Sequence, residues 1–392
     1  MRSIIRRARY LSAVETALTE NPACTLLGPR QCGKTTLARQ LAENRGAHFF
    51  DLETASARVQ LESPELALSP LRGLVVIDEI QRAPNLFATL RPLTDRPQTP
   101  ARFLILGSAS PELSKHVSES LAGRTGFVDM GGFDLSEVGN LGAPALWLRG
   151  GLPRSFLASS EPVSQRWRSN FIRTLLERDI PQLGIRIPAE TLRRFWMMIA
   201  HYHGQIWNGA ELARSLAVSE HSVRRYLDLL TGTFLLRQLP PWFENVGKRQ
   251  YKVPKIYVRD SGLLHTLLGI ETLEELRAHP KCGPSWEGFA LEQVLALTGA
   301  EQSFFWGTHA GAELDLLLIR RGRRFGIEFK VSDAPSMTKS LRIALEDLRL
   351  ERAWIVYPGE KRYVVHDQVE ALPLQSIGDG LATLCGNRPD EG

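Results

Sequence analysis

The sequence predicts an α/β fold in several domains, on three observations. Apolar runs alternate with helical segments in the N-terminal part, as expected for a doubly wound parallel sheet. A glycine-rich segment at residues 28–35 follows the first of these runs. Residues 312–331 predict a β-hairpin with acidic side chains on one face. With 392 residues, 43% of them hydrophobic, the chain is long enough for two or three domains.

The glycine-rich segment matches the phosphate-binding pattern G-x-x-x-x-G-K-[ST]. Its residues are Gly28, Pro29, Arg30, Gln31, Cys32, Gly33, Lys34 and Thr35. Glycines let backbone N–H groups turn toward phosphates, while Lys34 reaches the β- and γ-phosphates and Thr35 offers its hydroxyl to Mg²⁺. Residues 24–27 predict a buried strand before the loop. A helix that opens at Thr36 would direct its N-terminus at the anion, so the segment predicts an ATP and Mg²⁺ site that includes Thr36.

Two further apolar runs end in polar residues that suit ATP hydrolysis. Residues 74–79 predict a central parallel strand that ends in two acids. Asp78 can hold Mg²⁺ through water, and Glu79 can orient and polarise the attacking water. Residues 103–108 predict another buried strand, and Ser108 at its end is placed to sense the γ-phosphate or to position water. A plain turn serine is the alternative for Ser108.

These segments resemble AAA-type ATPases of bacteria and archaea in which the ATPase core leads an uncharacterised C-terminal region. The resemblance rests on GPRQCGKTTL, LVVIDEIQR, FLILGSAS, SLAGR and YVRDSGLLHTLLGI. It implies a P-loop ATPase core over residues 1–135 and self-association into a ring, with a hexamer as the expected size. In such rings an arginine from a neighbour completes each site. Arg124 is the candidate, Arg30 and Arg82 are less favoured, and an ordinary surface arginine is the alternative.

The middle of the chain predicts two mainly helical parts. Residues 136–205 predict a helical connector, which the resemblance implies is a lid beside the nucleotide. Residues 206–245 predict a helix, a short turn, a helix and a strand, which is the order of a winged helix-turn-helix. Asn208 and Ser219 are the expected N-caps of the two helices. Basic residues on the exposed face of the second helix could contact DNA phosphates, with a structural role or a protein contact as the alternative. They are His221, Arg224 and Arg225.

The acidic hairpin supports the most specific inference about the C-terminal part. A turn centred at residues 321–322 would place Asp315 directly opposite Glu328. The same register places Glu313 opposite Lys330, so that one face carries three acids and one lysine. Facing carboxylates repel, and a divalent cation between them would remove the repulsion. Such a site can activate water and stabilise a phosphorane-like transition state.

This pattern, with a helix that carries a glutamate, resembles the PD-(D/E)XK nuclease fold. The resemblance implies an α/β restriction-endonuclease-like domain over residues 246–392. The helix supplies Glu287 or Glu292 as a further acid, and Glu287 is favoured. The implied catalytic residues are Glu287, Asp315, Glu328 and Lys330, with Asp315 and Glu328 as metal ligands. A nuclease-like fold whose polar face is solvated, or only binds DNA, is the alternative.

Composition limits the remaining choices. The net charge of +5 is compatible with a nucleic-acid partner but does not require one. The arginines near the start are expected in a solvated first turn rather than on DNA; they are Arg2, Arg6, Arg7 and Arg9. Four scattered cysteines suit neither a zinc site nor a disulfide framework, which favours the cytoplasm. No apolar run approaches the ~20 residues that cross a bilayer, so no membrane is expected.

Two functions follow from these features. The first is an ATP-hydrolysing ring that remodels or translocates DNA, branched or structured DNA included, with metal-dependent cleavage as a further activity. The alternative is a nucleotide-switched protein-binding or signalling module with a catalytically inert nuclease-like domain. A nuclease with a degenerate ATPase is disfavoured because Lys34, Thr35, Asp78 and Glu79 are all present.

Overall fold

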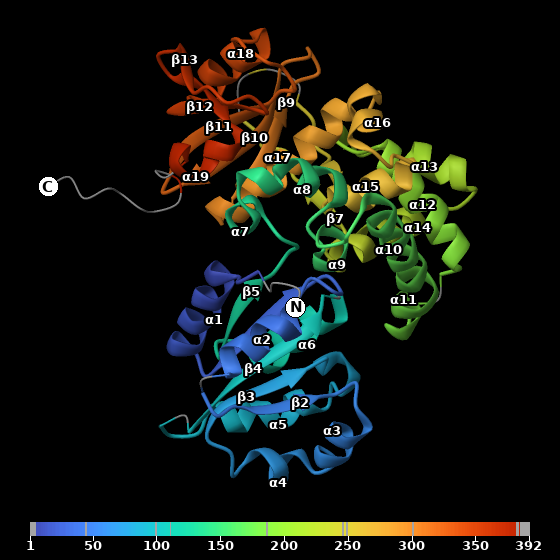
Figure 1. Cartoon of the computed structure of the whole chain (residues 1–392), viewed down its shortest axis with the longest axis vertical. Helices are drawn as coiled ribbons and strands as arrows, with labels where there is room; N and C mark the ends of the chain where they lie inside the picture. The colour runs from blue at the N-terminus through green and yellow to red at the C-terminus, as the bar shows by residue number, and fades with distance from the viewer. Residues whose placement is uncertain are drawn as a thin grey trace, which may run out of the picture. The chain divides into compact units, whose positions relative to one another are not determined.

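The computed structural model describes residues 5–381 and Leu384, apart from residues 44, 99, 110, 186, 245–246, 248–249 and 300–301. The chain divides into two compact units. One comprises Met1–Gly132 with Asp228–Leu235, and the other comprises Phe133–Leu227 with Leu236–Gly392. Figure 1 labels most of the helices and strands of both. No helix in the described part of the chain is both long and apolar enough to span a bilayer.

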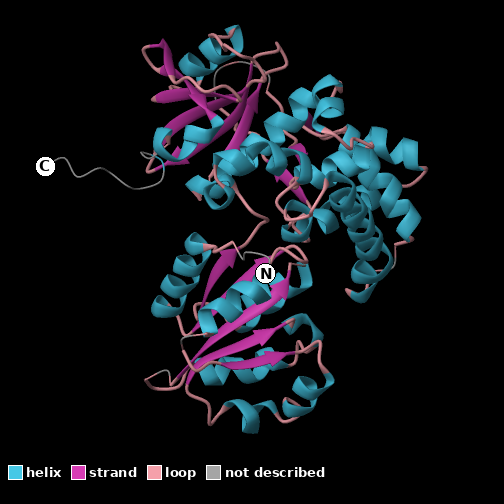
Figure 2. Ribbon diagram, in the orientation of Figure 1, coloured by secondary structure: helices cyan, strands magenta, loops and turns pink. Residues whose placement is uncertain are grey.

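The first unit is built on a five-stranded sheet in the order β2-β3-β4-β1-β5. Its strands are β1 Ala23–Gly28, β2 His48–Asp51, β3 Gly73–Asp78, β4 Ala101–Ser108 and β5 Thr125–Asp129. Every neighbouring pair is parallel, and Figure 2 shows the strands as magenta arrows among cyan helices. The three strands predicted from apolar runs are therefore present. Because the sheet is parallel, the carboxyl ends of β1, β3 and β4 meet at one edge.

Helices cover this sheet and bury the apolar side chains of its strands. They are α1 Ala8–Glu20, α2 Lys34–Ala42, α3 Ala55–Gln60, α4 Pro64–Leu68, η1 Ile80–Arg82, α5 Leu86–Thr94 and α6 Pro111–Ser120. Val75 and Ile77 of β3 pack in one core with Phe103 of β4 and Phe87 of α5. Burial on both faces explains why these strands are continuously apolar rather than alternating.

The second unit begins with a largely helical part. Its helices are α7 Leu135–Val138, η2 Asn140–Gly142, α8 Ala143–Arg149, α9 Pro153–Phe156, α10 Glu161–Thr174, η3 Leu175–Asp179, α11 Ile180–Gln182, α12 Ala189–His201, α13 Gly209–Leu216, α14 Glu220–Gly232, α15 Ser261–Leu268 and α16 Leu273–Ala278. Residues 228–232, at the end of α14, belong to the first unit. A small antiparallel sheet accompanies them in the order β6-β8-β7. Its strands are β6 Gln205–Ile206, β7 Leu236–Leu239 and β8 Lys255–Val258.

The predicted helix, turn, helix and strand are all present between residues 208 and 239. The Asn208 side chain accepts a hydrogen bond from the Glu211 N–H, and the Ser219 hydroxyl accepts one from the Ser222 N–H. Both expected N-caps are thus confirmed. The strand begins at Leu236, and Phe234 lies before it with a φ of 62°, which is outside the extended region.

A six-stranded sheet forms the C-terminal part, in the order β13-β14-β12-β11-β10-β9. The elements are α17 Cys282–Thr298, β9 Ser303–Gly307, β10 Glu313–Arg320, β11 Arg323–Phe329, α18 Lys339–Asp347, β12 Arg352–Tyr357, β13 Tyr363–His366, β14 Val369–Pro373, η4 Leu374–Ser376 and α19 Ile377–Gly380. Strands β10 and β11 form the predicted hairpin, and Leu316 pairs with Ile327 as expected. The predicted register is therefore confirmed from that pair to the turn.

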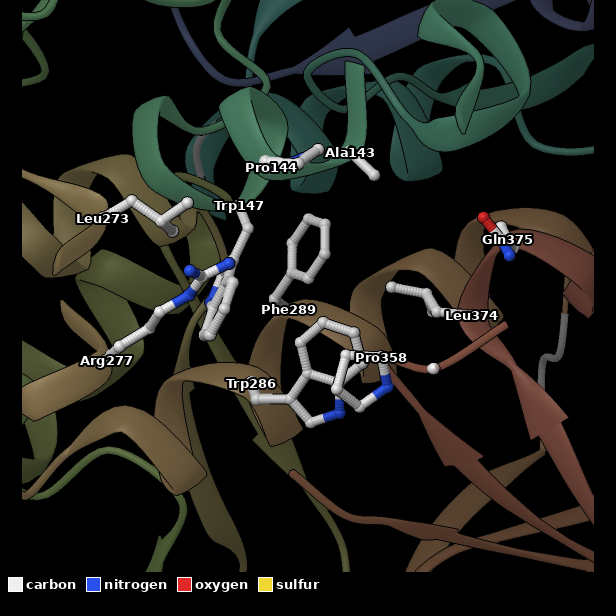
Figure 3. Close-up of a pocket in the computed structure, with 11 residues that line it drawn as sticks. Ala143, Pro144, Trp147, Leu273, Arg277, Trp286, Phe289, Pro358, Leu374 and Gln375 are labelled. Atoms are coloured by element: carbon white, nitrogen blue, oxygen red, sulfur yellow. The ribbon is translucent and has the colours of Figure 1, made fainter. Parts of the chain in front are cut away.

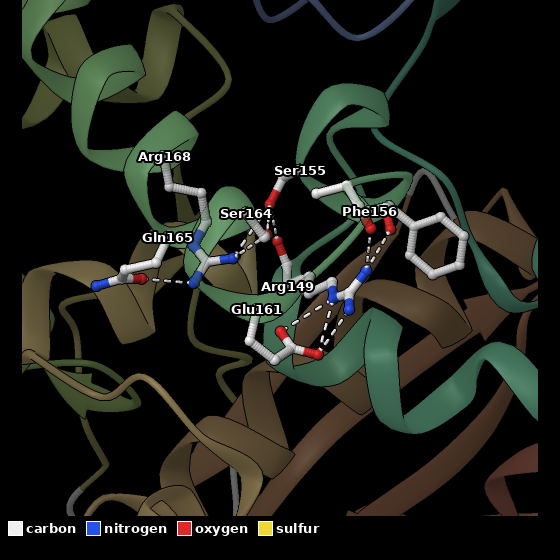
Figure 4. A network of polar contacts seen from close by, with 8 residues as sticks. Arg149, Ser155, Phe156, Glu161, Ser164, Gln165 and Arg168 are labelled. Atoms are coloured by element: carbon white, nitrogen blue, oxygen red, sulfur yellow. Dashed lines mark hydrogen bonds and ion pairs between the residues drawn. The ribbon is translucent and has the colours of Figure 1, made fainter. Parts of the chain in front are cut away.

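Residues 257–270, which carry part of the family resemblance, contain α15 and the residues that hold it in place. The Asp260 carboxylate caps this helix at the Leu263 N–H and accepts a second bond from the Gly151 N–H, both at 2.9 Å. A Cβ atom at Gly262 would lie 2.0 Å from the carbonyl oxygen of Arg149, so only glycine allows this approach. Next to it, Arg149 pairs with Glu161, and buried Arg168 contacts three polar side chains of α9 and α10, as Figure 4 shows.

Candidate functional site

The phosphate-binding loop connects β1 to α2. Gln31 and Gly33 have left-handed φ values of 61° and 106°, which turn the backbone around the loop. Gly28 has no space for a side chain, because a Cβ atom there would lie 2.2 Å from the carbonyl oxygen of Met130. Lys34 is buried, and its Nζ donates to the carbonyl oxygens of Gly28 at 3.0 Å and Pro29 at 2.9 Å. The lysine is therefore held against the loop that is expected to bind phosphates.

The predicted magnesium ligands lie in direct contact. The Thr35 hydroxyl donates to Oδ2 of Asp78 at 2.7 Å, and Asp78 is only 2% exposed. Burial raises the pKa of Asp78, and the bond from Thr35 and the charge of Lys34 partly oppose that shift. Two hard oxygen donors beside a lysine are the groups that a Mg²⁺–phosphate pair requires.

Glu79 follows the strand in a left-handed conformation with a φ of 58°. Its N–H donates to Oδ1 of Asp78 at 2.9 Å, and its carboxylate accepts a bond from the Gln81 amide. Burial raises the pKa of Glu79, while the charges of Lys34 and Arg30 lower it. A carboxylate with a raised pKa beside the phosphate loop is suited to accept a proton from water.

Ser108 lies at the same edge of the sheet. It ends β4, the strand between β1 and β3, and is the register partner of Gly28. Its Oγ is buried without a hydrogen-bond partner in the described part of the chain. A buried hydroxyl without a partner costs free energy unless a ligand or water supplies one. The structure therefore brings Ser108 together with Lys34, Thr35, Asp78 and Glu79 at one edge.

The candidate arginines occupy different places. Arg30 lies in the phosphate loop, and Arg82 pairs with Glu53 at 3.1 Å. Arg124 precedes β5 and holds Asp95 with two hydrogen bonds, at 2.6 and 2.9 Å. Because Thr125 pairs with Ala23 at the start of β1, Arg124 lies at the edge opposite the phosphate loop, roughly 16 Å away.

The C-terminal acids surround a lysine that the sequence analysis did not single out. The ammonium of Lys255, on β8, lies 3.3 Å from Oε1 of Glu287, 3.7 Å from Oδ1 of Asp315 and in contact with the Glu313 carboxylate. Its side chain is only 4% exposed. The Tyr257 hydroxyl donates to Glu287 at 2.6 Å. Alternation along β8 places Lys255 and Tyr257 on one face, which is the sequence feature that could have identified both.

Burial, with the negative charge of Asp315, raises the pKa of Glu287 to about 7. Glu287 lies in the acidic cluster because it shares the ammonium group of Lys255 with Glu313 and Asp315. Glu292 does not, because it pairs with Arg237 and Arg259. Although burial raises the pKa of Glu292, these two guanidinium groups lower it to about 2.

Glu328 has its own cation. It pairs with Lys330 at 2.8 Å and accepts a hydrogen bond from the Thr338 hydroxyl at 3.1 Å. Asp315 also accepts a bond from the Phe329 N–H at 2.9 Å. Both carboxylates predicted as metal ligands in the C-terminal part, Asp315 and Glu328, thus face an ammonium group. Among the described residues, no group of three or more His, Cys, Asp or Glu side chains is arranged to hold a metal ion.

A separate pocket of about 150 Å³ lies in the second unit, with Trp147, Trp286 and Phe289 in its wall. Figure 3 shows these three aromatic side chains together and Arg277 beside Trp147. The Trp147 indole N–H donates to the Ser285 hydroxyl at 3.0 Å. None of the described residues that line this pocket is a predicted site residue.

Comparisons with known proteins agree with this description. Residues 20–139 match an AAA domain, and residues 142–274 and 282–377 match two domains of unknown function, DUF8612 and DUF4143. Two mycobacterial proteins, the uncharacterized proteins Rv2008c of Mycobacterium tuberculosis and Mb2031c of Mycobacterium bovis, are each 52% identical over 374 residues. The alignment covers 95% of this chain and 85% of either relative.

A solved structure shows a similar fold. It is the Walker-type ATPase PABY2304 of Pyrococcus abyssi, with a TM-score of 0.50 and 15% sequence identity. The match covers 68% of this chain and 96% of that protein. At this identity the likeness concerns the fold alone, and it supports a P-loop ATPase core.

Proposed function

This chain belongs to the family of Rv2008c and Mb2031c, and on that premise we propose that it is a Mg²⁺-dependent ATPase. The observation that carries the proposal is the contact between Thr35 and Asp78, with Lys34 and Glu79 beside them. Thr35 and Asp78 would hold Mg²⁺, which would neutralise phosphate charge when bound. Lys34 would bind the phosphates, Glu79 would orient the attacking water and take its proton, and Ser108 would hydrogen-bond to phosphate or water.

Phosphate release by the purified chain, with ATP and Mg²⁺, tests this proposal. Lys34→Ala removes the phosphate-binding ammonium and should abolish turnover. Lys115→Ala is the matched control, since Lys115 is exposed on α6 of the same unit. Turnover that survives in Lys34→Ala would refute the assignment.

We further propose that the partner is DNA. Three basic side chains are exposed on α14, in the order of elements typical of a winged helix-turn-helix; they are His221, Arg224 and Arg225. Linear and branched DNA should stimulate ATP turnover. Arg224→Glu with Arg225→Glu should reduce that stimulation, whereas Arg342→Glu, at an exposed residue of α18, should not. Turnover indifferent to every DNA would favour a protein partner instead.

A second candidate for the C-terminal domain is an inert nuclease-like module that binds a partner. The helix α17, the strands β9 to β11, α18 and β12 follow one another in the order expected for a PD-(D/E)XK-like fold. However, Lys255 already compensates the charge of Glu287, Glu313 and Asp315, which favours the inert version over metal-dependent cleavage. If the purified protein cleaves plasmid DNA in Mg²⁺ or Mn²⁺ and Asp315→Ala abolishes this cleavage, the domain is an active nuclease rather than an inert module.

A further inference from the structure

Arg7 is a buried cation that joins two backbone segments of the first unit. Its residue is only 4% exposed, so the expectation of a solvated first turn is wrong for this arginine. Nη1 donates to the carbonyl oxygen of Cys32 at 3.1 Å and to that of Gly131 at 2.9 Å. Nη2 donates to the carbonyl oxygen of Gly132 at 2.6 Å. Cys32 belongs to the phosphate loop, whereas the two glycines follow β5.

The bond to Cys32 sets the direction of an amide in the phosphate loop. The peptide unit between Cys32 and Gly33 is planar and trans, so its carbonyl and its N–H point in opposite directions. Because the guanidinium of Arg7 holds the carbonyl, the Gly33 N–H has to point away from Arg7. Gly33 is one of the residues whose N–H groups are expected to surround the phosphates. Arg7 therefore orients a phosphate-binding donor before any phosphate arrives.

The other two bonds hold the chain where it leaves the first unit. Gly132 is the last residue of that continuous segment, and Phe133 is the first residue of the second unit. Tyr10 contacts both Arg7 and the segment after β5. Its hydroxyl accepts a hydrogen bond from the Gly131 N–H at 3.4 Å, and its ring lies 4.5 Å from the Arg7 guanidinium. One side chain thus contacts both the phosphate loop and the exit of the chain.

We propose that Arg7 is a positioning residue of the phosphate loop that couples phosphate binding to the position of the backbone at Gly131 and Gly132. This proposal adds a positioning residue to the proposed ATPase, and its kinetic test rests on that proposed function because it measures ATP turnover. A guanidinium suits this role because its fork of donors reaches several carbonyls at once, whereas a lysine ammonium is a point charge. Positive charge alone would attract phosphate without linking the two segments.

Four full-length proteins test the proposal: wild type, Arg7→Met, Arg7→Lys and the control Arg6→Met. Arg6 is the exposed neighbour of Arg7. The measurements are equilibrium binding of ADP, steady-state ATP turnover and amide hydrogen exchange. Arg7→Met should lower kcat/KM about ten- to a hundredfold, since small displacements of a positioned group have effects of this size. It should also weaken ADP binding, while Arg6→Met stays like wild type.

Amide hydrogen exchange distinguishes coupling of the two segments from a general loss of stability, because coupling changes exchange only at those segments. Arg7→Met should speed exchange at residues 31–34 and at residues 130–133 together, while exchange in α12 stays unchanged and reports intact folding. ADP should slow exchange at residues 130–133 in wild type and fail to do so in Arg7→Met. Arg7→Lys should resemble Arg7→Met, because it keeps the charge but not the fork.

Two results would overturn the coupling. One is an Arg7→Lys protein that behaves like wild type, which would mean that the positive charge of Arg7 suffices and its several hydrogen bonds are not needed. The other is unchanged exchange at residues 130–133 in Arg7→Met. Failure of the proposed function is distinguishable, because a wild-type protein that neither binds ADP nor hydrolyses ATP would refute that function alone. The exchange comparison without nucleotide would still decide whether Arg7 holds both segments.

Discussion

The ammonium group of Lys255 lies 3.3 Å from Oε1 of Glu287, one of the acids that the resemblance to metal-dependent nucleases implied as catalytic. Asp315 and Glu313 share the same ammonium. One buried lysine lies among three carboxylates, and its attraction to each of them offsets the repulsion between them. The cluster can therefore persist in the fold without a bound metal.

Replacing Lys255 with methionine should leave these carboxylates without their cation. Breaking a buried ion pair by removing one partner costs about 3–5 kcal/mol, so the free energy of unfolding measured with urea should fall by that order. Arg173→Met is the control, since its pair with Glu177 is exposed and should contribute at most about 1 kcal/mol. An unchanged stability of Lys255→Met would show that the carboxylates do not depend on the lysine.

Divalent cations should distinguish Lys255→Met from wild type. With the lysine removed, Glu287, Glu313 and Asp315 offer oxygen ligands of the kind that Mg²⁺ and Mn²⁺ bind. Millimolar Mn²⁺ should therefore raise the melting temperature of Lys255→Met more than that of wild type, because both proteins share the proposed site at Thr35 and Asp78. Equal stabilisation of both proteins would mean that the ion binds elsewhere.

Glu79→Gln should separate ATP binding from ATP hydrolysis. The substitution keeps the size of the side chain and removes its ability to take a proton from water, so turnover should fall about 10²–10⁴-fold. ATP binding should remain, because Lys34 and Thr35 are untouched. The control is Glu119→Gln, whose pair with Lys115 on α6 is exposed. Glu79→Gln with wild-type turnover would assign the water-activating role to another residue.

The sequence predicted features that depend on neighbouring residues and missed contacts between residues that are far apart in the chain. The strand before Gly28, the acids at residues 78–79 and the hairpin follow from adjacent residues, and all are present. The predicted register of the hairpin is confirmed from the Leu316–Ile327 pair to the turn. Lys255 was missed because it meets Glu287 and Asp315 only through the packing of β8 against distant elements. Arg7 was assigned to solvent for the same reason, since its partners at Cys32 and Gly131 come together only in the folded unit.

His265 should make stability depend on pH in a way that a variant can isolate. Burial lowers the pKa of His265 to about 4, below its ordinary value of 6.5. As pH falls below about 6.5, the unfolded chain binds a proton that the folded chain does not, so the stabilising contribution of neutral His265 is lost. Each pH unit between these values should cost up to about 1.4 kcal/mol.

The contributions of the other titrating groups cancel when the unfolding free energies of wild type and His265→Gln are subtracted at each pH. The difference in unfolding free energy between the two proteins should shrink as pH falls from 7 toward 5. His201→Gln serves as the control, because His201 is exposed at the end of α12. A difference that stays constant over this range would contradict the lowered pKa.

Arg124→Ala should test whether one copy of the chain completes the nucleotide site of another. Arg124 lies at the sheet edge opposite its own phosphate loop, and its ion pair with Asp95 is partly exposed. Its removal should therefore change stability by at most about 1 kcal/mol. If Arg124 acts in a neighbour's site, within the ring that the family resemblance implies, turnover should fall about 10³-fold or more.

Mixing two inactive variants gives the decisive measurement. Lys34→Ala keeps Arg124 and lacks a working phosphate loop, whereas Arg124→Ala keeps the loop and lacks the arginine. A mixed ring would place the arginine of the first protein beside the loop of the second, so part of the ATP turnover should return on mixing. Turnover that stays absent at every ratio, although the proteins co-assemble in size-exclusion chromatography, would remove Arg124 from the neighbour's site. Arg30 and Arg82 would then be the arginines to exchange next.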